Sequence, residues 1–142
     1  MNKVINIFAI AILFFSNITV AETFKVKSIC FQTNDYSNLY LLVPITLQYP
    51  KMTKGFDKLL HLKCTDGLCK GMTMNRNIAN NEISLFDFIV IDNLKRTVNK
   101  PGYAVLEWGL NLVTIDFNNK KVTWNETGTT DDTLGSGTAT CN

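Results

Sequence analysis

The chain has 142 residues but a single histidine, His61, so it is poor in the side chain most often used for acid–base chemistry and metal binding. It also lacks paired C-x-x-C motifs, a G-x-S-x-G nucleophile motif, a P-loop and a G-x-G-x-x-G fingerprint. His61 alternates with two leucines, which is typical of a strand residue at the surface rather than of a general base. We therefore expect a protein that is not an enzyme, with no catalytic residue, no metal site and no cofactor.

Net charge is also small, because 14 basic residues face 12 acidic ones. Proteins that bind nucleic acid usually carry a marked basic excess, so we expect no nucleic-acid partner. The charges are nevertheless placed unevenly. Basic residues outnumber acidic ones between residues 51 and 76, which indicates either a solvated face or a basic patch that meets an acidic partner.

Long hydrophobic runs are missing except at the start of the chain. Lys3 precedes an apolar run from Val4 to Phe15, and small and polar residues then lead to Ala21. This run of about a dozen residues is shorter than the roughly 20 that a membrane-spanning helix needs. The layout predicts a signal peptide over 1–21, a single mature β domain over 22–142, a periplasmic or secreted location and no membrane span after signal cleavage.

Cysteine is scarce, but the four cysteines all lie in the predicted mature chain: Cys30, Cys64, Cys69 and Cys141. An even number of cysteines in an oxidising compartment usually forms disulfides. Asp66-Gly67 is typical of a two-residue hairpin turn, which places Cys64 directly opposite Cys69 at a distance compatible with a disulfide. This geometry favours the pairs Cys64–Cys69 and Cys30–Cys141. The alternative, Cys30–Cys64 with Cys69–Cys141, remains open.

Helical periodicity does not persist for three turns anywhere in the mature chain, whereas alternation with period two is frequent. In residues 39–49, Leu41, Val43 and Ile45 fall on one side, and Pro44 predicts that this strand lies at a sheet edge or carries a bulge. Similar strands are expected at 24–33, 58–64, 69–75, 82–92, 103–108, 110–117, 120–126 and 137–142. The pattern of about eight or nine strands predicts an all-β fold, a disulfide-stabilised antiparallel sandwich or small barrel.

Candidate binding residues come from the turns and from the polar sides of the strands. Tyr36, Tyr40 and Trp108 lie near turns or opposite the apolar faces, while Lys63 and Lys70 flank the predicted disulfide-linked hairpin. We therefore predict a module that binds another extracytoplasmic protein, the general build of small exported inhibitors and immunity-type proteins. Two alternatives remain: a barrel that carries a small apolar ligand and, less favoured, a hydrolase that uses carboxylates.

Overall fold

The computed structural model describes residues 27–49, 56–79, 82–127 and 135–142, and the predicted leader lies outside these ranges. The described residues form ten strands and no helix: β1 (Ile29–Gln32), β2 (Leu39–Leu47), β3 (Phe56–Thr65), β4 (Leu68–Asn77), β5 (Glu82–Ile91), β6 (Lys95–Lys100), β7 (Tyr103–Trp108), β8 (Asn111–Asp116), β9 (Lys121–Glu126) and β10 (Gly135–Thr140). No helix long and apolar enough to cross a membrane therefore occurs in these ranges.

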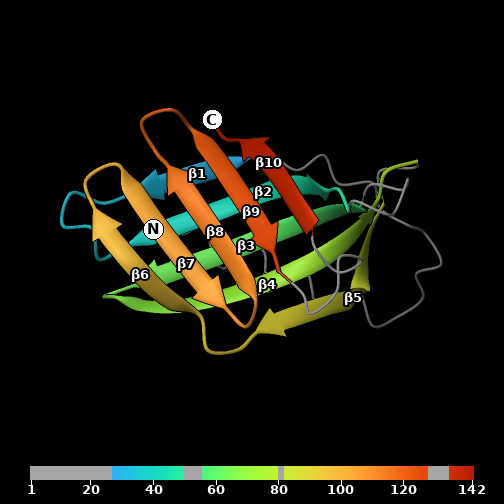
Figure 1. Ribbon diagram of the computed structural model, residues 1–142, viewed down its shortest axis with the longest axis horizontal. Coiled ribbons are helices and arrows are strands. Elements are labelled where there is room, and N and C mark those ends of the chain that lie inside the picture. Colours follow the sequence, from blue (N-terminus) through green and yellow to red (C-terminus); the bar gives the residue numbers. More distant parts are fainter. Residues whose placement is uncertain (1–26, 50–55, 80–81, 128–134) are drawn as a thin grey trace, which may run out of the picture.

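The strands form two five-stranded antiparallel sheets, sheet A (β1 to β5) and sheet B (β6 to β10), each with its strands in chain order. The two sheets stack face to face with their strands crossing at an angle (Figure 1). The predicted all-β fold is confirmed, and it is a sandwich rather than a barrel. β6 was not predicted from the sequence, because this edge strand has one aliphatic residue, Val98, and shows no alternation.

Alternation along the strands explains the core, because every second residue of a strand points to the same face. The inward side chains of β2 are fully buried, while those that alternate with them are not. The core between the sheets is filled by large apolar side chains, among them Leu39, Leu41, Ile45, Leu47, Leu60, Leu62, Leu106, Ile115 and Trp124. The indole N–H of the buried Trp124 has a hydrogen-bond partner, since Nε1 donates to Oδ1 of Asn111 at 2.9 Å.

Pro44 lies in an interior strand, so the prediction of an edge or bulged strand is wrong. β2 pairs with β1 on one side and, without a register break, with β3 on the other. The short β1 covers only Leu39–Leu42 of β2. Of the strand predicted over 24–33, Lys27 and Ser28 are not in a strand, and residues 24–26 lie outside the described ranges. Pro44 therefore lies beyond the end of β1, where a missing N–H interrupts no pairing with that strand.

Both disulfides follow the favoured pairing, and the alternative pairing is wrong. Cys64 and Cys69 are cross-strand neighbours with a Cα–Cα distance of 4.0 Å. Cys30 on β1 is bonded to Cys141, which follows β10, with a Cα–Cα distance of 5.7 Å. This second bridge joins sheet A to sheet B. Two disulfides among four cysteines fit an oxidising, extracytoplasmic environment.

Candidate functional site

One end of sheet A is built from two turns that brace each other, the loop 33–38 and the hairpin 64–69, here called the stapled end. The central hairpin residues, Asp66 and Gly67, both have positive φ (52° and 79°), as a two-residue type I′ turn requires. The amide of Gly67 donates to the carbonyl of Ser37 at 3.0 Å, and the amide of Asp66 donates to Oδ1 of Asn38 at 3.0 Å. Both turns lie at the left end of sheet A in Figure 1.

The loop 33–38 is ordered by its own hydrogen bonds around Asp35. The Thr33 hydroxyl and the Ser37 amide both donate to Oδ1 of this carboxylate. The hydrogen bond from Thr33, followed by those from Ser37, lowers the pKa of Asp35 below its usual value. The amide of Tyr36 donates to the carbonyl of Thr33 at 3.0 Å and closes the turn. The loop therefore presents a defined shape rather than a flexible tip.

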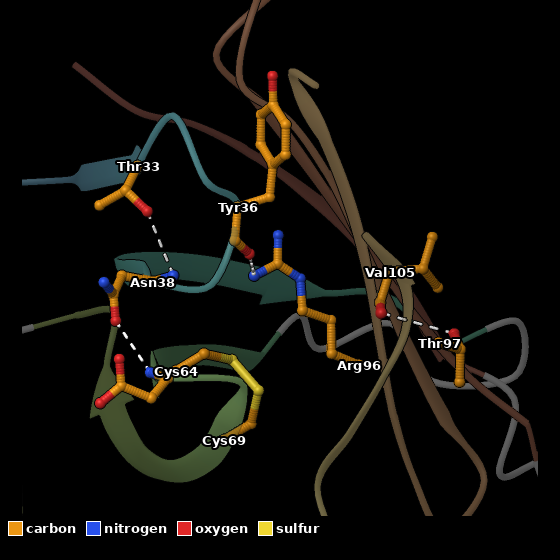
Figure 2. The surroundings of a disulfide bond; sticks show 9 residues. Thr33, Tyr36, Asn38, Cys64, Cys69, Arg96, Thr97 and Val105 are labelled. Carbon is orange, nitrogen blue, oxygen red and sulfur yellow. Dashed lines mark hydrogen bonds between the residues drawn. A yellow bond between two sulfur atoms is a disulfide. The ribbon is translucent and has the colours of Figure 1, made fainter. Parts of the chain in front are cut away.

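Tyr36 occupies the tip of this loop in a left-handed conformation, with φ at 60°. That conformation costs a non-glycine residue roughly 1–2 kcal/mol, and such residues are concentrated at functional sites. Arg96 of β6 donates to the Tyr36 carbonyl and helps to hold the conformation. In Figure 2 the tyrosine ring points away from both Arg96 and the disulfide. Burial of Arg96 lowers the pKa of its guanidinium.

The outer face of sheet A carries a row of four side chains from four adjacent strands. Phe31, Tyr40, Lys63 and Lys70 follow one another in register across β1, β2, β3 and β4, and we call them the aromatic–lysine row. The rings of Phe31 and Tyr40 are stacked with centroids 5.6 Å apart, and Phe31 is 49% exposed. His61 meets Tyr40 edge-on at 5.3 Å. An aromatic surface is thus continuous with two cations.

Lys63 and Lys70 are exposed and directly opposite each other. Like charges at such a cross-strand position destabilise a sheet. In the described parts of the chain the ion pairs are Lys58–Glu126 and Arg76–Asp57, and neither involves this lysine pair. Burial, and then the charge of Lys63, lower the pKa of His61, so the histidine is predominantly neutral at neutral pH. The row therefore combines unneutralised positive charge with apolar surface.

The structure brings four of the five predicted binding residues to this end of sheet A: Tyr36, Tyr40, Lys63 and Lys70. It does not bring Trp108 there. Trp108 ends β7 and packs against the buried Trp124, with ring centroids 5.6 Å apart. Phe31 was not among the predicted binding residues. Alternation from the inward Cys30 was the signal that could have placed Phe31 on the outer face.

A second polar cluster links the two sheets. Lys58 lies on the inner face of sheet A, 3.7 Å from Oε1 of Glu126 and over the ring of Trp124. The Tyr49 hydroxyl donates to Glu126, and burial followed by this carboxylate raises the Tyr49 pKa, so the phenol stays protonated. A shallow depression of about 540 Å³ is lined by Gln48, Tyr49, Asn125, Glu126, Thr127, Gly135 and Ser136. Glu126, the one charged residue among these, is already paired with Lys58 and accepts from Tyr49, which indicates a structural link between the sheets.

Within the described ranges, no group of three histidine, cysteine or acidic side chains is placed to hold a metal ion. No protein family, no curated protein and no solved structure matches the chain.

Proposed function

We propose that this protein is exported and binds another extracytoplasmic protein through the aromatic–lysine row and the adjoining stapled end. The leader-like residues 1–21 and the two disulfides support export. The observation that carries the binding proposal is the exposed Phe31–Tyr40 stack beside two opposed lysines that have no described acidic partner. Such an arrangement lowers the stability of the free protein and becomes favourable only when something acidic covers it.

The chemistry of the row specifies the kind of surface that it fits. Exposed aromatic rings supply large contact areas with few rotatable bonds, and interface hot spots are enriched in them. Two ammonium groups on adjacent strands fit two carboxylates on the partner. We therefore expect a partner surface with an apolar centre and acidic residues on one side of it. The complementary charges should also make association faster than between uncharged surfaces, and the rate should fall as the salt concentration rises.

Rigidity strengthens the proposal. Phe31, Tyr40, Lys63 and Lys70 stand on strands rather than loops, and the disulfide Cys64–Cys69 closes the hairpin next to the lysines. A surface that is already ordered loses less conformational entropy on binding, which leaves more of the contact energy as affinity. Neither a reactive centre nor a cofactor is required for this role.

The test uses the disulfide-bonded protein as bait on envelope and medium fractions of its source cells, followed by affinity measurements with the protein that it captures. The charge-reversed variant Lys63→Glu/Lys70→Glu is compared with a matched control, Lys100→Glu/Lys120→Glu, which reverses two exposed lysines, one at the end of β6 and one in the β8–β9 turn. Tyr40→Ala tests the aromatic part of the row. Circular dichroism and thiol titration check that each variant is folded and oxidised.

We expect the control to bind like the wild type. Lys63→Glu/Lys70→Glu should weaken binding about tenfold, since two exposed ion pairs together contribute up to about 2 kcal/mol and about 1.4 kcal/mol is a factor of ten. Tyr40→Ala should weaken it as well. Equal binding by the two charge-reversed variants would show that the row is not the binding surface.

A further inference from the structure

The two sheets have four outer edges, and three of them are closed to an added strand. β1 is only four residues long and is held by Cys30–Cys141. β10 is tied to the end of β2, because Gln48 and Ser136 exchange backbone hydrogen bonds of 2.9 and 3.1 Å. β6 carries the cations Lys95, Arg96 and Lys100, a common protection against edge-to-edge association.

The fourth edge, β5, differs in composition. Phe88, Ile89 and Val90 are consecutive and are 51%, 60% and 56% exposed. Phe88 and Val90 pair with Met74 and Met72 of β4, on the outer face, while Ile89 pairs with Thr73 and points to the opposite face. β5 is the last strand of sheet A, with no further described strand beside it. Over Phe88–Val90, both faces of this edge strand are therefore apolar and open to solvent.

The register shows which peptide groups of β5 face outward. In a hairpin closed by a two-residue turn, Thr65 and Leu68 form a hydrogen-bonded pair, and such pairs then alternate along the strands. By this alternation, Gly71 and Thr73 of β4 direct their peptide groups toward β5. Their partners Ile91 and Ile89 point back toward β4. The peptide groups of Phe88 and Val90 consequently face the free edge.

We propose that this edge pairs with β5 of a second copy of the chain, in antiparallel orientation about a twofold axis that lies midway between the two copies of Ile89. In this register, Phe88 and Val90 of one copy lie opposite Val90 and Phe88 of the other, and each pair exchanges two backbone hydrogen bonds. The two copies form one ten-stranded sheet. Both aromatic–lysine rows lie on the same face of that sheet.

A second copy fits this edge because the segment is complementary to itself. On the outer face, the twofold register places Phe88 of each copy against Val90 of the other, and an aromatic side chain opposite a β-branched one is a favourable cross-strand pair. On the inner face it places Ile89 against Ile89. The paired residues Phe88 to Val90 carry no charge, so no like charges are brought together. The regular part of β5 is short, because the register shifts between Met74 and Arg76. The interface is therefore small and the dimer reversible.

The test measures molar mass by light scattering and sedimentation across the micromolar range, with protein expressed as the full chain and purified in its disulfide-bonded form. Val90→Lys places a charge at the paired position. Val90→Pro removes one outward N–H without removing a hydrogen bond to β4, so the sandwich is retained. The matched control is Leu110→Lys, which places the same charge at an exposed apolar residue of the β7–β8 turn.

We expect the wild type and Leu110→Lys to dimerise as concentration rises and both Val90 variants to remain monomeric, with unchanged circular dichroism. A wild type that is monomeric throughout the range would overturn the proposal. Dimers that persist in a folded Val90→Lys protein would also overturn the proposal, because the contact between copies would then lie elsewhere. If Val90→Pro fails to fold, Val90→Lys alone tests the proposed contact. Partner binding by the aromatic–lysine row is measured separately and does not depend on this outcome.

Discussion

The two disulfides close loops of very different length, and this difference makes a quantitative prediction. Cys30 and Cys141 are separated by 111 residues in sequence, whereas Cys64 and Cys69 are separated by 5. In the loop-entropy relation, a bridge restricts the unfolded chain more as its loop grows. The relation gives roughly 5 kcal/mol for the long loop and roughly 2 kcal/mol for the short one, a difference of about 3 kcal/mol.

The perturbation is the replacement of each pair by alanine, giving Cys30→Ala/Cys141→Ala and Cys64→Ala/Cys69→Ala. The two variants are matched, because each removes one buried cysteine (Cys141 or Cys64) and one partly buried cysteine (Cys30 or Cys69). The cavities left by the sulfur atoms therefore cost similar amounts. The difference between the variants then reports chiefly on the loop closed in the unfolded state.

The assay is equilibrium unfolding in guanidinium chloride, followed by the fluorescence of Trp108 and Trp124, whose rings are in contact in the core. We expect the variant without Cys30–Cys141 to lose about 3 kcal/mol more free energy of unfolding than the variant without Cys64–Cys69. Equal losses, or a larger loss for the hairpin variant, would refute the reasoning. Such a result would mean that Cys64–Cys69 stabilises the native stapled end directly, beyond its effect on the unfolded chain.

Two further changes test the outer face and the core. The pKa of His61 is lowered in the folded protein, so the unfolded chain binds more protons in acid. The free energy of unfolding should therefore fall as the pH drops from about 7 toward 5. Denaturant unfolding of His61→Gln at both pH values should show a smaller fall. Gly71→Ala places a Cβ atom 2.7 Å from side-chain atoms of both Leu62 and Ile91, and should lower the free energy of unfolding by about 1–3 kcal/mol. An unchanged unfolding midpoint in this variant would show that the contact relaxes without cost.

The hairpin 64–69 shows what can be predicted from residues that are close together in sequence. Asp66-Gly67 fixes a two-residue turn, the turn fixes the register, and the register places Cys64 opposite Cys69. Each step involves neighbours in sequence, so each could be predicted. The same holds for Tyr40 and Lys63, whose outward directions follow from the alternation of the strands.

Other features depended on elements that are distant in sequence. Pro44 indicated an edge strand, but the length of β1 decided that proline is tolerated in an interior one. β6 has almost no apolar alternation, and its pairing with β7 makes it a strand. Trp108 lies near a turn like a surface residue, yet it packs against Trp124 from another strand. Local propensity cannot report such contacts, because the partner residues are set by how the chain folds back.

By itself the sequence determined the strand periodicity, the hairpin turn and the four cysteines, because these rest on side-chain alternation and on the conformations that Asp and Gly tolerate. Only the tertiary structure decided that the strands form two stacked sheets, that Cys30–Cys141 joins them, and that Phe31, Tyr40, Lys63 and Lys70 stand in one row. The physical reason is register between strands. Alternation determines on which face of the sheet a side chain lies. Which side chains lie beside it is determined only by the register with the neighbouring strand.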